Sequence, residues 1–177
     1  RRLEEARQLR LSGKFVESLK VLESEVSQKP GRKNSSELAE GWLNIALNYW
    51  NLGEVARAEN AFIFVQALAD EKNDQAIKDY ARTSLEIIRL YQEAKRKRQE
   101  KSYQEAEAIF LSGINLARKN GMKEMELKCL RQLNLLYWVM GEMEKFASSS
   151  ESKLSIARLL NNRHEEIRSL DSIGVYY

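Results

Sequence analysis

The sequence predicts an all-α fold, a right-handed α-solenoid of stacked helix-turn-helix hairpins. Three observations predict this class. The 177 residues include eight Gly and one Pro, whereas an all-β fold needs these residue types for a turn every ten or so residues. Apolar residues recur at helical spacing, and no apolar run approaches the roughly 20 residues of a membrane-spanning helix. One pattern of aromatic, small and glycine residues also returns along the chain, which is typical of a repeat protein.

The clearest repeat is a helical hairpin between Ala39 and Val65. Apolar residues at i, i+3, i+4 and i+7 predict one buried helix face, a glycine ends that helix, and a second amphipathic helix follows. Small residues let the two backbones approach while aromatic rings fill the space around them. The frame consists of Trp42, Ile45, Ala46 and Tyr49 on the first helix, Gly53 in the turn, and Ala58, Ala61, Phe62 and Val65 on the second helix.

Less complete copies of this frame occur along the chain, at successive shifts of 40, 48, 40 and 40 positions. Two departures fall in the fourth hairpin, where Phe146 stands at the small-Ala position and Ser150 at the Phe position. We therefore expect its second helix to pack differently or to slip by one residue onto Ala147. In the third hairpin, Glu93 and Lys97 stand where apolar residues are expected. The copies comprise Gly13, Leu22 and Pro30; Ala106 and Phe110; Leu130, Leu133, Tyr137 and Gly141; and Leu170, Ile173, Gly174 and Tyr177.

This frame resembles the tetratricopeptide repeat (TPR), in its long form of about 40 residues. The resemblance covers nearly the whole chain and is most specific in the second hairpin. The same long repeat form occurs in the arrays of kinesin light chains and bacterial peptide-pheromone receptors. Such arrays are binding or sensing modules and are not themselves catalytic, so the resemblance implies an interaction module.

The pattern predicts nine helices, and each has its own justification. Residues 1–11 and 15–28 flank Gly13; 36–52 and 55–70 flank Gly53; 74–98 and 102–119 form the hairpin of Ala106 and Phe110; 122–140 and 143–160 flank Gly141; and 163–177 carries Leu170 and Tyr177 without a partner helix. The connectors between hairpins are Pro30 to Ser35, Glu71 to Asp74, Lys119 to Gly121, and Asn161 to Arg163.

The helix over 74–98 is unusually long and absorbs the eight extra residues of the longest shift. Two registers remain open for it. Either Leu90 and Ala94 keep the frame of Ala106, or Ala81, Leu85 and Ile88 form the buried stripe.

Charge and single residues argue against several function classes. The net charge of +3 arises from 29 basic and 26 acidic side chains, a mixed surface unlike the basic patch of a nucleic-acid binder. Cys129 is expected to be a buried small residue, and His164 a surface residue. The sequence lacks a glycine-rich phosphate loop, metal-ligand spacing and a nucleophile motif, so we expect no catalysis, no cofactor and no metal. The basic run from Lys95 to Arg98 is interpreted as a solvated helix end, with contact to an acidic protein or a nucleic acid as alternatives.

In stacked hairpins the first helices line the concave wall, where partners usually bind. Residues that point away from the buried stripe of these helices mix cations with apolar and aromatic groups, which predicts a groove for an acidic peptide with apolar side chains. Trp50 and Trp138 either anchor the ligand or pack against the neighbouring hairpin. The asparagines either clamp peptide backbone or are solvated polar positions. The predicted peptide-binding residues are Arg7, Arg10, Leu43, Asn44, Leu47, Asn48, Trp50, Asn51, Lys128, Arg131, Asn134, Leu135, Trp138 and Arg168.

Together these observations predict one solenoid domain over residues 1–177 that binds a protein or peptide as a scaffold or sensor. We expect a piece of a longer, cytoplasmic protein whose exposed last helix either packs against another copy or is partly frayed. One alternative is the regulatory arm of a larger signalling enzyme or transcription regulator. Another is a peptide receptor that changes superhelical pitch, with the longest shift of the frame as its hinge.

Overall fold

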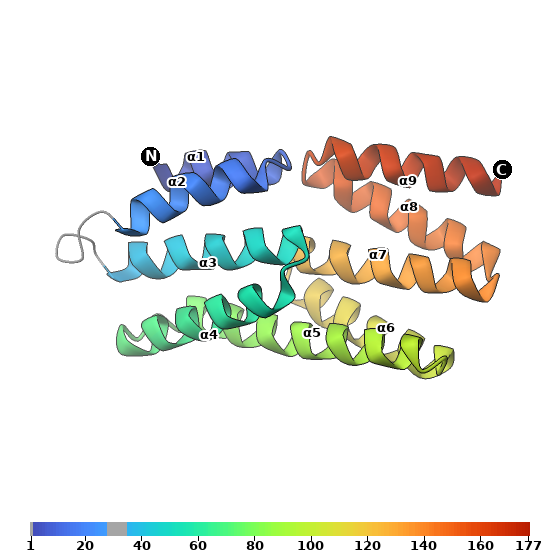
Figure 1. Ribbon diagram of the computed structural model, residues 1–177, viewed down its shortest axis with the longest axis horizontal. Helices are drawn as coiled ribbons and strands as arrows, with labels where there is room; N and C mark the ends of the chain where they lie inside the picture. Colours follow the sequence, from blue (N-terminus) through green and yellow to red (C-terminus); the bar gives the residue numbers. More distant parts are fainter. Residues whose placement is uncertain (1, 28–34) are drawn as a thin grey trace. The chain divides into compact units, whose positions relative to one another are not determined.

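A computed structural model describes residues 2–27 and 35–177. Within these ranges the chain forms nine α-helices and no strand (Figure 1), as the sequence predicts, and the ends agree with the predicted ones to within one residue. Pro30 and most of its connector lie outside the described residues. The helices are α1 (Arg2–Leu11), α2 (Phe15–Ser27), α3 (Ser35–Leu52), α4 (Val55–Glu71), α5 (Gln75–Gln99), α6 (Tyr103–Lys119), α7 (Lys123–Met140), α8 (Met143–Leu159) and α9 (Arg163–Tyr176).

One type of turn joins successive helices throughout the described chain. Each turn contains one residue with positive φ, between 54° and 83°, and the N–H that follows it donates to the carbonyl five residues back. This is the Schellman arrangement, which satisfies the last carbonyls of a helix and reverses the chain within three residues. The positive-φ residues are Gly13, Gly53, Asn73, Lys101, Gly121, Gly141 and Asn161.

From Gly53 onward these turns recur at every twentieth position, so one helix plus its turn is the structural unit and two such units make a hairpin. The exception is the interval from Asn73 to Lys101, which is eight residues longer and contains α5. The eight extra residues therefore lie in α5, as the sequence predicts. They add about two turns of helix at 3.6 residues per turn.

Side chains eight residues apart meet across each of the six turns from Gly53 to Asn161. Four of these contacts are ion pairs, and two place a cation over a tyrosine ring. They are Arg57 over Tyr49 at 5.6 Å, Lys78 with Asp70, Lys97 with Glu105, Arg118 with Glu126 at 2.9 Å, Lys145 over Tyr137 at 5.5 Å, and Arg158 with Glu166 at 2.9 Å. Each contact holds the facing ends of two consecutive helices together.

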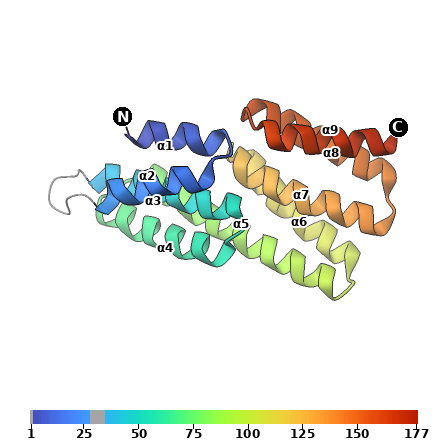
Figure 2. The same ribbon diagram turned by 45° about the horizontal axis from the view of Figure 1, so that its top comes forward.

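The helices divide into two compact units, residues 1–85 and 86–177. In each unit consecutive helices run antiparallel (Figures 1 and 2), and their apolar faces form the core. In the first unit, Ala6, Leu19, Leu22 and Ile45 form a buried cluster with Trp42 and Tyr49 packed against it. In the second unit the large buried side chains include Phe110, Ile114, Met125 and Leu136. Among the described residues, no helix combines the length and apolar content needed to cross a membrane.

The buried stripe of α5 combines the two registers that the sequence left open. Ala81 and Ile88 are fully buried, as the second register requires, and Ala94 is fully buried, as the first requires. Leu85 and Leu90 are only half-buried. The boundary between the two units falls after Leu85. The N-terminal part of the buried stripe of α5 therefore belongs to the first unit, and the C-terminal part belongs to the second. One domain over residues 1–177 therefore stays a prediction.

The fourth hairpin shows how its departures from the frame are accommodated. Asn134 stands where the second hairpin has Ala46, and Ser150 stands where it has Phe62. The Asn134 amide donates to the Ser150 hydroxyl at 2.9 Å, so a larger polar residue on α7 faces a smaller one on α8. Phe146 and Ala147 are both buried, so α8 packs differently from α4 and keeps both residues in the core.

Candidate functional site

The predicted ligand-facing residues of the second unit form an ordered row on α7 and α9. We call Lys128, Arg131, Leu135, Trp138 and Arg168 the first-helix row, together with Asp171 and Val175 on the same face of α9; within it Lys128 is buried and Asp171 is an exposed carboxylate. Its cations lie toward the N-terminal ends of the two helices, and its apolar groups lie toward the C-terminal ends. Leu135, Trp138 and Val175 are 44%, 49% and 61% exposed. Large apolar side chains exposed in a row are a usual mark of an interaction surface.

The cations of this row outnumber the carboxylates around them. The Arg131 Nε lies 3.5 Å from Glu165, a carboxylate that is almost fully buried and also lies 3.7 Å from the Lys153 Nζ. Burial, together with the positive charges of Arg131 and Lys95, lowers the pKa of Lys128 to about 8. Burial is the main cause of this lowering, and the neighbouring cations add to it.

Five of the predicted residues in the first unit are buried instead of facing solvent. Arg10, Asn44, Leu47, Asn48 and Trp50 are each at most 7% exposed. The Arg10 Nη2 donates to the Asn44 Oδ1 at 3.0 Å, which ties α1 to α3. The Asn48 amide donates to the Ser18 hydroxyl at 2.9 Å, which ties α2 to α3. These amides hold the hairpins together, so peptide binding at these positions stays a prediction.

The remaining predicted residues differ in exposure. Arg7 is exposed and lies 3.8 Å from Glu4, and Leu43 and Asn51 are half-buried. Asn134 of the second unit is buried, and its amide donates to the carbonyl of Phe146 at 2.9 Å and to the hydroxyl of Ser149 at 2.7 Å. Its own carbonyl accepts from Lys153 at 3.3 Å. Asn134 therefore has intramolecular partners for both ends of its amide.

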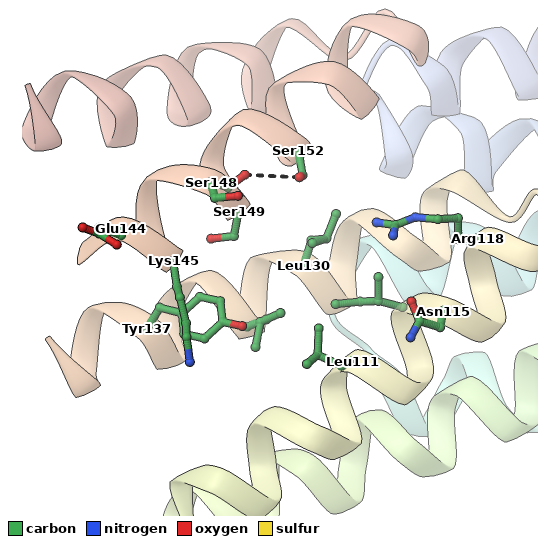
Figure 3. Close-up of a pocket in the computed structure, with 12 residues that line it drawn as sticks. Leu111, Asn115, Arg118, Leu130, Tyr137, Glu144, Lys145, Ser148, Ser149 and Ser152 are labelled. Atoms are coloured by element: carbon green, nitrogen blue, oxygen red, sulfur yellow. Dashed lines mark hydrogen bonds between the residues drawn. The ribbon is translucent and has the colours of Figure 1, made fainter. Parts of the chain in front are cut away.

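A groove that sequence reasoning missed lies among α6, α7 and α8 (Figure 3). We call it the second-helix groove, because α6 and α8 are the second helices of their hairpins. Its volume is about 350 Å³, within the range of small-ligand sites. Figure 3 shows Leu111 and Leu130 in the middle, Glu144, Lys145 and Tyr137 at one end, and Asn115 and Arg118 at the other. The full lining is Leu111, Ile114, Asn115, Arg118, Leu130, Leu133, Tyr137, Glu144, Lys145, Ser148, Ser149 and Ser152.

The first unit has a pocket at the equivalent place in the repeat, with a volume of about 390 Å³. Its lining is Trp42, Tyr49, Arg57, Asn60, Ala61 and Phe64. Adding 88 to each number gives Leu130, Tyr137, Lys145, Ser148, Ser149 and Ser152, which all line the second-helix groove. This recurrence at the frame spacing is the sequence signal that could have located both pockets. The aromatic pocket of the first unit has become a serine-lined groove in the second.

Cys129 is buried and His164 is exposed, as the sequence predicts. Burial raises the pKa of the Cys129 thiol to about 12, which keeps it protonated and unreactive at neutral pH. Within the described ranges, no three His, Cys, Asp or Glu side chains are grouped as a metal site would require.

The hairpin frame, its regularly spaced turns and its antiparallel helix pairs are now established from the chain itself. This is a TPR-like repeat fold. Two similar crystal structures come from Podosopora anserina and are described as a putative kinesin light chain with nearly identical TPR-like repeats. One is 18% identical with a TM-score of 0.41, and covers 98% of this chain and 85% of that chain. The other, a variant, is 17% identical with a TM-score of 0.41, and covers 99% and 83%.

No protein-family model matches the chain, and no curated protein matches it. The TPR-like description therefore rests on the helices and turns of the chain itself.

Proposed function

We propose that this chain is a scaffold that binds a protein or peptide through the first-helix row of its second unit. The observation that carries the proposal is the order of that row, with cations in one half and exposed apolar groups in the other. Such an order is complementary to a segment with acidic residues at one end and apolar residues at the other. Arg and Trp, which dominate binding hot spots, are both present.

The geometry supports a role for each exposed member of the row. Arg131 and Arg168 attract the acidic end, and the buried Glu165 holds Arg131 in place at 3.5 Å. Trp138 packs against Phe146 in a tilted arrangement, with ring centroids 5.3 Å apart and an interplanar angle of 52°, which orders the indole before a ligand arrives. An anchor that is already ordered loses little conformational entropy on binding. Leu135 and Val175 extend the apolar half of the surface.

Selection of peptides on the full chain tests this proposal. A random peptide library is selected against the wild-type chain and against the double variant Arg131→Gln/Trp138→Ala. The wild-type chain is expected to enrich sequences with adjacent acidic and apolar residues, and the double variant is expected to bind them at least about 10-fold more weakly. Binding should also weaken as salt is raised, because exposed charges are screened.

The matched control is Arg96→Gln/Leu159→Ala, which removes an exposed arginine and an exposed apolar residue of the same unit outside the row. Peptides selected on the wild-type chain are expected to bind this control with unchanged affinity. Equal binding to wild type and to Arg131→Gln/Trp138→Ala would remove the first-helix row as the site.

A further inference from the structure

The two ends of the second-helix groove have opposite chemistry. At one end the Arg118 Nε donates to Glu126 at 2.9 Å, while its two terminal nitrogens make no hydrogen bond with any described residue. Glu126 is 1% exposed and also accepts from Lys123 at 2.8 Å, so a buried carboxylate fixes the guanidinium. The Asn115 amide beside it is exposed and has no partner among the described side chains. This end offers donors to an anion.

The other end of the groove is already neutralised. The Tyr137 hydroxyl and the Lys145 ammonium both donate to the Glu107 carboxylate, each at 3.0 Å. The Glu107 interaction raises the pKa of Lys145, so this cation stays charged and paired. Glu144 adds an exposed carboxylate. A ligand anion is therefore attracted to the Arg118 end and not to this one.

Between the ends lie an apolar floor and a polar edge. Leu111 and Leu130 lie on the floor, and Ser148 and Ser152 lie along α8 at the edge (Figure 3). Leu133 also lines the groove. Glu107 and Arg118 are 11 positions apart on α6, which corresponds to about 16 Å at 1.5 Å per residue. An extended peptide rises about 3.3 Å per residue, so roughly five residues fit along the groove.

We propose that the second-helix groove binds the C-terminal end of a partner peptide. The terminal carboxylate pairs with the free nitrogens of Arg118 and with the Asn115 amide, and apolar side chains lie on the leucine floor. The end of the chain fits better than an internal acidic residue, because Arg118 lies one residue before the end of α6, where the groove ends. This site shares no residue with the first-helix row, so the inference goes beyond the proposed function.

Nuclear magnetic resonance of the full 177-residue chain tests the proposal. The probe is the tetrapeptide N-acetyl-Leu-Leu-Ser-Val with a free C-terminal carboxylate. It is expected to shift the side-chain amide signals of Asn115 and to leave the indole signal of Trp138 unchanged. The same peptide with a C-terminal amide is expected to bind about 10-fold more weakly, the usual loss of a charge-assisted hydrogen bond.

Two variants and one control sharpen this test. Arg118→Gln is expected to weaken binding about 10-fold. Arg158→Gln is the matched control, because Arg158 is the equivalent residue one hairpin later, pairs with Glu166 at the same 2.9 Å and does not line the groove. Ser152→Phe replaces the polar edge of the groove with an aromatic ring, as Phe64 does at the equivalent place in the first unit, and is expected to weaken binding while the helix content stays unchanged.

Several outcomes would overturn the proposal. They are equal binding of the free-acid and amide peptides, equal effects of Arg118→Gln and Arg158→Gln, unaltered binding by Ser152→Phe, or a shift of Trp138 in place of Asn115. The last outcome would favour the first-helix row and so separates this inference from the proposed function. If N-acetyl-Leu-Leu-Ser-Glu amide binds as tightly as the free acid, the assignment to a chain end is wrong.

Discussion

Lys101 adopts a backbone conformation that favours glycine. Its φ is 61°, in a turn of the same type that other connectors form with Gly121 or Gly141. A left-handed conformation costs a residue with a side chain about 1–2 kcal/mol, a cost that glycine avoids. Glycine is also more flexible in the unfolded chain, which offsets part of this advantage. We therefore predict that Lys101→Gly raises the free energy of unfolding by about 1 kcal/mol, measured by urea titration.

The reverse change at an equivalent turn provides the control. Gly121 has a φ of 67°, and a Cβ built there meets nothing within 4 Å. Gly121→Ala should therefore lower the free energy of unfolding by about 1 kcal/mol through backbone strain alone. If Lys101→Gly destabilises the protein while Gly121→Ala has no effect, backbone strain does not govern these turns.

Lys128 makes stability depend on pH above neutrality. Burial lowers its pKa to about 8, below the value of about 10.4 in an unfolded chain. Between these values the unfolded state binds more protons than the folded state, so this residue makes stability rise with pH. Lys153 acts in the same direction, because burial lowers its pKa also.

We predict that Lys128→Met shows a smaller gain in the free energy of unfolding between about pH 8 and about pH 10 than the wild-type chain. Urea titrations at several pH values measure this difference. Lys119→Met, at an exposed lysine, is expected to leave the pH slope unchanged. Equal slopes for wild type and Lys128→Met would contradict the lowered pKa.

At the scale of one element, α9 exposes a face that the equivalent helix buries. Ile167 and Leu170 are 59% and 46% exposed, whereas Leu127 and Leu130, at the equivalent positions of α7 one hairpin earlier, are 6% and 4% exposed. Among the described helices, α7 packs against both α6 and α8, and α9 packs against α8. Gly174 lies one turn beyond Leu170 on the same side of α9, and a Cβ built there meets nothing within 4 Å, which leaves room for another helix.

We predict from this face that copies of the chain associate through α9. Sedimentation velocity over a range of concentrations should show an increasing mass for the wild-type chain. Leu170→Glu should reduce that increase, because it places a charge in the contact. Val16→Glu, at an exposed apolar residue of α2, is the control that should not. A wild-type chain that stays monomeric at every concentration would contradict the prediction.

The elements were predictable because their signals are local. Helical spacing around Trp42 and the glycine at position 53 define a hairpin without reference to the rest of the chain. Burial of Asn44 and Asn48 was not predictable in the same way. A helical wheel gives the direction of a side chain but not the helix that covers it, and here the covering groups are Arg10 and Ser18. Trp138 is 49% exposed, but the sequence left two roles open for it, and its part in ligand binding stays a prediction.

At the scale of the whole molecule, the boundary inside α5 predicts two units of independent stability. Each unit has its own core, and in a stack of hairpins each hairpin is stabilised by its neighbours. Leu22 and Leu136 are fully buried, one in each core, so replacing either with Ala should cost about 2–5 kcal/mol. We predict that this loss stays within the unit that carries the substitution.

Native-state hydrogen exchange measures that loss helix by helix. Leu22→Ala is expected to speed exchange in α1 to α3 and to leave α6 to α8 protected, and Leu136→Ala is expected to do the opposite. The exchange rates of the α5 amides distinguish two folding units from a single cooperative domain. If its N-terminal half follows Leu22→Ala and its C-terminal half follows Leu136→Ala, the eight extra residues join two folding units. If either substitution speeds exchange along the whole chain, residues 1–177 unfold as one cooperative domain, and the division within α5 has no energetic meaning.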